Sequence, residues 1–182
     1  TKTGIMYDIT SHKTSRNKYG EFWNSFRVSL KKYNLLNDKH IPPEYLVNSR
    51  EVRLNLLAGL VDSDGYYDAK SCCFEIVQKK KSLINDILQL CRSLGFRSNI
   101  SECIKSCKYK GEIKSGTYYR MIISGNIEDI PTKLQRKMAR KRETNKDPLV
   151  YDIQVVPKEN DRYYGFEIDG NRRFLLGDFT VT

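Results

Sequence analysis

Two acidic residues lie close together at the end of an apolar stretch, where carboxylate chemistry is possible. Asp62 and Asp64 are two positions apart, just before Gly65. Such a pair either accepts hydrogen bonds from local amides in a helix-ending turn or offers oxygen ligands to a cation. A calcium loop counted from Asp62 is excluded, because position six is Tyr67 instead of glycine and position twelve is Cys73 instead of glutamate.

The cysteines do not form a metal-binding pattern. There are five, an odd number, without a CxxC pair: Cys72, Cys73, Cys91, Cys103 and Cys107. Cys103 and Cys107 are four apart, but no second pair or nearby histidine completes a zinc set. His12 and His40 are distant in sequence. We therefore expect reduced thiols, some of them buried.

The acidic pair follows a predicted helix from Arg50 to Val61, with Ser49 as its N-cap. Apolar residues occupy most of the circumference of this helix, which predicts burial on more than one side. The acids themselves are expected in the turn that ends it.

Alternating helices and strands surround this helix. Strands are predicted at Tyr66–Ala69, Cys73–Gln78, Phe96–Ile104 and Thr117–Ser124, with a helix at Ser82–Leu94 between the two pairs and a loop at residues 108–111. An irregular helical stretch toward Lys141 completes an αββαββα order. Before this block we expect a polar lead-in at residues 1–21 and a helix from Phe22 to Tyr33. After it we expect only strands, at Leu149–Val156, Tyr163–Ile168 and Arg173–Leu176.

The charge of the chain points to a polyanionic partner. The formal net charge is +10, and the sequence pI is about 9.3. No apolar run approaches the roughly 20 residues that span a membrane, and no signal-like start is present. We therefore expect an intracellular, non-secreted protein, in the nucleus or cytoplasm, without a membrane partner.

Three segments resemble a known family. Residues Leu57 to Gly65 read LAGLVDSDG, which is similar to the LAGLIDADG motif of homing endonucleases. The block Asp38 to Pro42 resembles the lysine-containing segment ahead of the second such motif in inteins. Residues 163–169 and 174–178 resemble the end of an intein splicing domain. The chain is thus similar to the C-terminal part of an intein with a DOD-type endonuclease. This resemblance implies an α+β fold, with an αββαββα half followed by Hint strands.

The resemblance also implies a catalytic centre. In the family two motif helices pack together, small residues such as Ala58 and Gly59 allow close approach, and each helix delivers one carboxylate to the DNA. Here that carboxylate belongs to Asp64, which would hold Mg²⁺, while Asp62 would be mainly structural. The metal activates a water and neutralises charge on the leaving oxygen. Lys39 and Lys137 are the implied catalytic lysines.

The strands are expected to form the DNA-binding face, since paired strands fit the major groove and basic side chains bind phosphates. The candidates are polar or aromatic residues of the strands and of the basic segment Lys105–Lys114: Tyr66, Tyr67, Lys70, Gln78, Lys79, Lys105, Lys108, Lys110, Lys114, Tyr118 and Arg120.

These implications predict three regions. Residues 1–48 form a lead-in and the end of a first endonuclease half, 49–146 the LAGLIDADG half, and 147–182 the C-terminal β segment of the splicing domain. The expected partners are double-stranded DNA, a host protein as extein, and either the N-terminal part of the intein or a second copy of the chain.

The chain also departs from the intein pattern. It lacks an initial Cys or Ser, a Thr-x-x-His motif, a terminal His-Asn and the first LAGLIDADG motif, and Arg172 occupies a position where many inteins carry histidine. By itself the chain is therefore expected neither to splice nor to complete a two-carboxylate site. Two other interpretations stay open: a free-standing endonuclease that has lost splicing, and a non-catalytic nucleic-acid binder of the maturase or transcription-regulator kind.

Overall fold

The computed structural model describes Arg16, Lys18, Gly20 and residues 24–141, 147, 150, 152–162 and 164–181. The expectations for the rest of the lead-in and for Phe22, Trp23, Leu149, Tyr151 and Tyr163 lie outside these residues. The chain divides into two compact units, Thr1–His40 and Ile41–Thr182. The first contains helix α1 (Ser25–Lys32), whose N-cap Asn24 accepts a hydrogen bond from the Arg27 amide at 3.1 Å.

The second unit is built around helix α3 (Arg50–Asp64), which follows the short helix α2 (Pro43–Leu46). The Ser49 hydroxyl caps α3 by accepting from the Val52 amide at 3.3 Å. The helix runs three residues beyond the predicted end, so the acids form its last turn and not a separate turn. Arg53 fixes the other end through hydrogen bonds to Ser93 at the end of α4.

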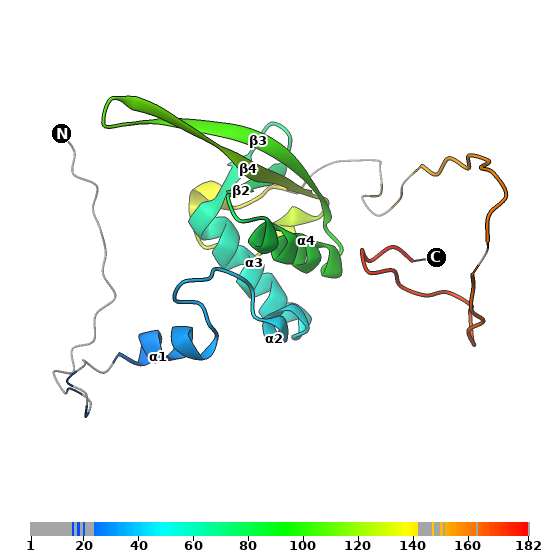
Figure 1. The fold of residues 1–182 in the computed structure, drawn as a ribbon, viewed down its shortest axis with the longest axis horizontal. Coiled ribbons are helices and arrows are strands. Elements are labelled where there is room, and N and C mark those ends of the chain that lie inside the picture. Colours follow the sequence, from blue (N-terminus) through cyan, green and yellow to red (C-terminus); the bar gives the residue numbers. More distant parts are fainter. Residues whose placement is uncertain are drawn as a thin grey trace. The chain divides into compact units, whose positions relative to one another are not determined.

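The sheet has four antiparallel strands in the order β1-β2-β4-β3 (Figure 1). Their bounds are Gly65–Asp68, Cys73–Gln78, Arg97–Tyr109 and Glu112–Ser124 for β1, β2, β3 and β4. Helix α4 (Lys81–Ser93) connects the two hairpins. The first six elements of the predicted order are confirmed, and the fold is α+β as predicted.

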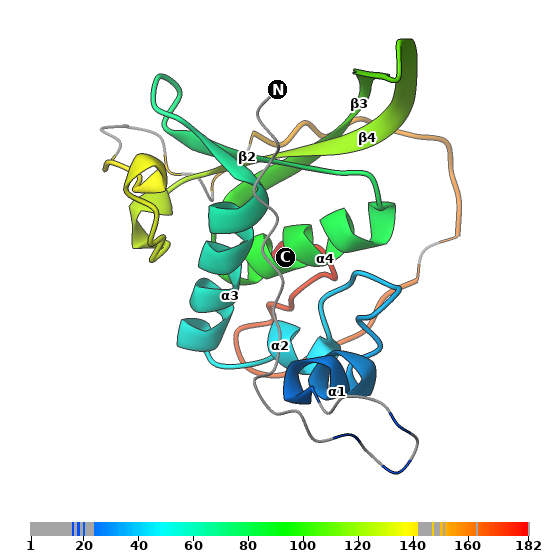
Figure 2. The same cartoon turned by 90° about the vertical axis from the view of Figure 1, so that its left-hand side faces the viewer.

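The core lies between the sheet and the helices α3 and α4. Both views place these helices against the same face of the sheet (Figures 1 and 2). The side chains of Leu57, Phe74, Ile87 and Met121 are fully buried there, one from each of four elements. The cysteines are free, and burial in this core raises the pKa of the Cys91 thiol. No helix among the described residues of this unit lies against the opposite face of the sheet.

Strands β3 and β4 extend far beyond β2 as a two-stranded ribbon. Only Tyr119–Ile123 of β4 pairs with β2, whereas β3 and β4 pair without a break from Arg97↔Ser124 to Tyr109↔Glu112. Lys110 and Gly111 join them with φ of 50° and 88°, as a type I′ turn requires. The predicted loop at residues 108–111 is therefore shorter than expected and consists of Lys110 and Gly111, because Lys108 and Tyr109 belong to β3.

Two other expectations were wrong in the C-terminal third. The irregular helical stretch consists of two short 3₁₀ helices, η1 (Ile127–Asp129) and η2 (Gln135–Lys137), with Pro131 between them. The described residues of the tail, from Asp152 onward, form no strand beyond one isolated bridge, Leu175↔Val181. Strands need partners for their backbone groups, and the described chain supplies none to the tail. No described helix combines the length and apolar composition that a membrane crossing requires.

Candidate nuclease site and nucleic-acid interface

Asp64 is the last residue of α3, and its carboxylate is exposed. Gln78, at the end of β2, donates from Nε2 to Asp64 Oδ2 at 2.9 Å. Sequence reasoning assigned Gln78 to the DNA face, whereas the structure places it beside the candidate metal ligand. A carboxylate at a helix C-terminus meets the negative end of the helix dipole. That placement is unfavourable for the helix but attracts a cation.

Asp62 has a different environment. Its Oδ2 accepts from the Lys133 amide at 2.8 Å and its Oδ1 from the Leu134 amide at 3.3 Å. Both oxygens are therefore occupied by backbone donors 71 and 72 residues further along the chain. This arrangement matches the expected structural role of Asp62 and leaves Asp64 as the exposed carboxylate of the pair.

Lys137 reaches the end of the same helix from η2. Its side chain is buried, and Nζ donates to the Val61 and Asp62 carbonyl oxygens, both at 2.7 Å. These carbonyls belong to the last turn of α3, where helices leave acceptors unsatisfied. Burial lowers the pKa of Lys137 and Arg136 lowers it further, while Asp62 and Asp64 raise it. The structure thus brings Lys137 and the acidic turn together.

Gly65 allows the tight passage from α3 into β1. A Cβ at this position would lie 2.7 Å from the Val61 carbonyl oxygen and 2.9 Å from Val61 Cα. Such contacts are shorter than real Cβ atoms tolerate, so any side chain would push the end of the helix and the strand apart. The glycine of the motif therefore fixes where the Asp64 carboxylate lies relative to the sheet.

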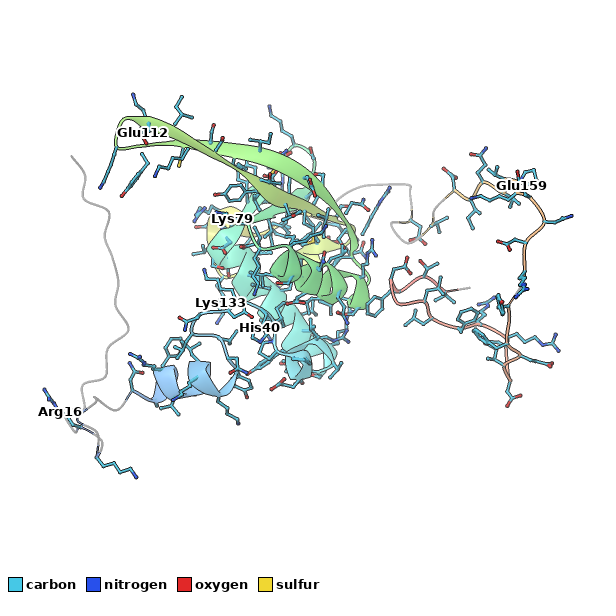
Figure 3. The ribbon with its side chains drawn as sticks, in the orientation of Figure 1. Arg16, His40, Lys79, Glu112, Lys133 and Glu159 are labelled. Atoms are coloured by element: carbon cyan, nitrogen blue, oxygen red, sulfur yellow. The ribbon has the colours of Figure 1, made fainter. Side chains whose placement is uncertain are left out.

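The strand register divides the predicted DNA-binding residues between the two faces of the sheet, because directly paired residues share a face. Tyr66, Lys105, Lys114, Tyr118 and Arg120 lie on the face opposite the helices, hereafter the open face. Figure 3 shows Glu112 at the tip of the ribbon, with side chains on both sides of the two strands. The Tyr109 ring lies 5.5 Å from Lys110 Nζ and 5.0 Å from Lys114 Nζ.

The other candidates lie elsewhere. Tyr67 is on the helix-covered face, where its ring centroid is 5.3 Å from that of Phe74 and its hydroxyl accepts from the Arg140 amide. Lys108 shares that side of the ribbon. Lys70, Lys79 and Lys110 occupy the ends or turns of strands. Lys39 belongs to the N-terminal unit, and its catalytic role stays a prediction.

Several open-face residues were missed by sequence reasoning. They are uncharged or lie between known core positions, and the alternation around Ile76, Met121 and Ile123 was the signal that could have found them. One row crosses all four strands and contains the predicted Tyr66 together with Glu75, Ile122 and Asn99, which were not predicted. Arg97 and Ser101 lie on the same face of β3.

The acidic helix end, the lysine behind it and the basic residues of the open face make up the candidate site, and sequence comparison gives the family of the chain. A family model described as homing endonuclease matches residues 40–151, more than half of the chain. The chain belongs to the homing endonuclease family.

Three relatives extend this match. The chain is 27% identical over 176 residues to the homothallic switching endonuclease of Saccharomyces cerevisiae, covering 88% of this chain and 30% of the relative. It is 28% identical to the replicative DNA helicase DnaB of Mycobacterium intracellulare, covering 84% and 26%. It is 29% identical to the ATP-dependent DNA helicase Hel308 of Thermococcus kodakarensis, covering 78% and 14%. The chain thus spans less than a third of each relative.

Proposed function

We propose that this chain is one half of a LAGLIDADG-type homing endonuclease that hydrolyses phosphodiester bonds in double-stranded DNA at a specific site. The observation that carries the proposal is the exposed Asp64 carboxylate, held by Gln78 at the end of α3 beside a four-stranded sheet with a basic open face. Membership of the homing endonuclease family supports the same activity.

The residues at this helix end fit Mg²⁺ as a cofactor that is shared with the substrate. Among the described residues no group of three or more His, Cys, Asp or Glu could enclose a metal by itself. Mg²⁺ does not need such a cage, because it keeps several waters and commonly binds one or two carboxylates together with phosphates. Asp64 would be the ligand of this chain. Bound there, the metal would activate a water and stabilise the leaving oxygen.

The remaining residues have separate proposed roles. Gln78 restricts the orientation of the Asp64 carboxylate, and Lys137 holds the last turn of α3 while contributing positive charge close to the scissile phosphate. Lys39 is proposed as a second catalytic lysine. The lysines of the ribbon and strand ends would bind phosphates, and the open-face side chains would contact base edges.

A partner would pack against the outer side of α3. Val52, Leu56, Gly59 and Ser63 follow one stripe of this helix at helical spacing, and a Cβ on Gly59 would meet nothing within 4 Å. Small residues allow another helix to approach closely. We propose that the occupant is the motif helix of a first endonuclease half, from the N-terminal part of an intein or from a second copy. It would bring the second carboxylate.

The tail supports the intein context. Tyr164, Phe166 and Leu175 are 81%, 69% and 58% exposed, although large apolar side chains are normally covered. Phe166 and Phe174 contact each other edge to face, with ring centroids 4.8 Å apart. We propose that these residues complete a Hint splicing domain whose other strands come from an N-terminal segment, in a precursor where a host protein is the extein.

A free-standing endonuclease without splicing is the second candidate. Arg172 stands where many inteins carry histidine, and the match to the yeast switching endonuclease covers 88% of this chain. Both candidates share the same nuclease site.

The nuclease is tested by changing the carboxylate that we assign to the metal. In the full-length protein containing this chain, Asp64→Asn should abolish cutting of at least one strand of a supercoiled plasmid carrying the bound site. Binding to the same DNA should be largely retained, because the substitution keeps shape and removes only charge. Gel analysis with Mg²⁺ distinguishes linear, nicked and uncut plasmid.

Glu51→Gln is the matched control, since it removes an exposed acid from the first turn of the same helix and should leave cutting unchanged. Normal double-strand cutting by the Asp64 variant would refute the assignment. A wild-type protein that binds DNA but never cuts it would favour the non-catalytic binder.

A further inference from the structure

Arg120 differs from the lysines of the ribbon in how it is held. It lies on β4 in the four-stranded part of the sheet, where its Nε is 3.3 Å from Oε1 of Glu75 on β2. The register makes the two residues diagonal neighbours on the open face, since Arg120 pairs with Val77 and Glu75 pairs with Ile122. The two side chains are 40% and 28% exposed.

The contact between Arg120 and Glu75 leaves hydrogen-bonding capacity unused. Arg120 Nε is buried and has no hydrogen-bond acceptor, so its approach to Glu75 is a contact between charges. Buried donors without an acceptor are rare in folded proteins. Because Nε is buried while the side chain as a whole is 40% exposed, the exposed surface belongs to its other atoms. On this face those atoms lie toward the side from which DNA would approach.

A guanidinium held in this way is suited to a base edge more than to a phosphate. The neighbouring carboxylate restricts the side chain and would repel a phosphate. The planar guanidinium keeps donors that match the O6 and N7 acceptors of guanine in the major groove, which is the commonest specific contact of arginine with DNA. By contrast, Lys105 and Lys114 are exposed on the ribbon, where flexible ammonium groups suit phosphates.

We propose that Arg120 reads a guanine in the recognition sequence and that Glu75 is the positioning residue for its guanidinium. The inference rests on the proposed function, because it assumes that the open face binds duplex DNA. The inference specifies which base Arg120 would contact. It also explains why an acid, Glu75, lies on a face whose other charged residues suit an anion.

The test is a selection from duplexes with a randomised central segment, using the full-length protein that contains this chain and three variants of it. The wild-type chain should enrich a consensus with one guanine that is preferred by about 10- to 100-fold over other bases. Arg120→Lys keeps the charge but loses the bidentate fork, so it should lose that preference alone and keep the remaining consensus. Glu75→Gln should weaken the preference at the same position.

Lys114→Ala is the matched control from the same face. It should keep the whole consensus, bind all sequences more weakly, and lower the slope of log affinity against log salt by about one. Arg120→Lys should leave that slope unchanged. Arg120→Gln serves as a second variant if the lysine variant melts well below the wild type.

Three results would overturn the proposal in different ways. If the Arg120 variants keep the guanine preference, guanine reading by Arg120 is refuted while the DNA-cleaving function stands. If Glu75→Gln keeps it but Arg120→Lys does not, the positioning role of Glu75 is refuted. If the full-length wild-type protein enriches no duplex and shows no salt dependence, both this inference and the proposed function fail.

Discussion

Contacts from residues far along the chain converge on the last turn of α3. Asp62 binds the backbone at Lys133 and Leu134, and Lys137 binds the carbonyls of Val61 and Asp62. A helix that ends in two acids is unfavourable by itself, because they meet the negative end of its dipole. The ammonium of Lys137 places a positive charge at this end of the helix, at the cost of burying that charge.

Replacing Lys137 with methionine should reveal the cost of its buried charge. Because burial lowers the pKa of Lys137 in the folded chain, this group contributes least to stability at pH values below its folded pKa, where it is charged in both states. Its contribution should rise as the pH passes the folded pKa toward the ordinary lysine value. The free energy of unfolding of the wild type, relative to Lys137→Met, should therefore increase between about pH 7 and about pH 10.5.

Urea unfolding of both proteins across this range measures the difference, and titration of the other groups cancels in the comparison. Lys133→Met is the control, because Lys133 is exposed and only its backbone amide binds Asp62. A difference that stays flat with pH for Lys137→Met would contradict the linkage.

The sequence could predict the residues of this site better than their contacts. The family resemblance named Asp64 and Lys137 as candidates from their positions in the sequence, and their catalytic roles stay predictions. The hydrogen bond from Lys137 to Val61 joins positions 76 apart, and no periodicity reports such a contact. Gln78 was predicted to bind DNA because its position at the end of β2 does not show that its side chain contacts Asp64.

At the scale of elements, the two glycines of the motif have opposite roles. Gly65 stands where a Cβ would collide with the backbone of Val61, whereas Gly59 stands where a Cβ would meet open space. Glycine inside a helix lowers stability by roughly 0.5–1 kcal/mol relative to alanine. In return, Gly59 leaves room on the outer side of α3.

This contrast predicts opposite effects of the same substitution. Gly59→Ala should stabilise the isolated chain by about 0.5–1 kcal/mol, because it improves helix propensity without a clash. Gly65→Ala should destabilise it by more than about 1 kcal/mol, because the backbone must shift. Guanidinium unfolding followed by circular dichroism compares the two variants with the wild type. Equal effects of both substitutions would contradict the proposed roles.

Elements with a strong pattern were predicted well. Strand β2 has the predicted bounds, and α4 differs by one residue at each end, because their apolar spacing is regular. The lengths of β3 and β4 were underestimated because the outer half of the ribbon faces solvent on both sides and carries no alternation of apolar and polar residues. The stretch after β4 was predicted as helix, but Pro131 and its short apolar spacing yield 3₁₀ turns that pack Ile127 and Ile130 into the core.

At the scale of the whole molecule, the tail is the part that most needs a partner. Residues 152–156 contain Ile153 and Val155, which are 88% and 89% exposed. An intein precursor would cover such residues with strands of its N-terminal segment. Amide exchange should therefore be fast in residues 152–181 of this chain alone and slower by at least tenfold when the upstream segment is present.

Exchange measured by mass spectrometry on both proteins tests this expectation, and peptides from α4 are the internal control, since their core is complete in either case. Unchanged fast exchange in the longer protein would count against the Hint domain and in favour of the free-standing endonuclease. A precursor restored to the full splicing pattern and flanked by extein sequences should also show ligated flanks by mass.

The length over which β3 and β4 pair without a break would limit the length of DNA sequence that the proposed endonuclease half contacts. Thirteen residues in each strand, at about 3.4 Å per residue, extend over roughly 40 Å, close to one turn of B-DNA. One turn holds about ten base pairs, and a given sequence of that length occurs by chance about once per 10⁶ base pairs. A genome offers roughly 10⁶–10⁹ competing sites, so such a sequence is not unique in it. Two halves reading about twenty base pairs would recur about once per 10¹². Pairing of two halves along α3 would thus lengthen the recognition sequence from one that occurs many times in a genome to one that occurs once.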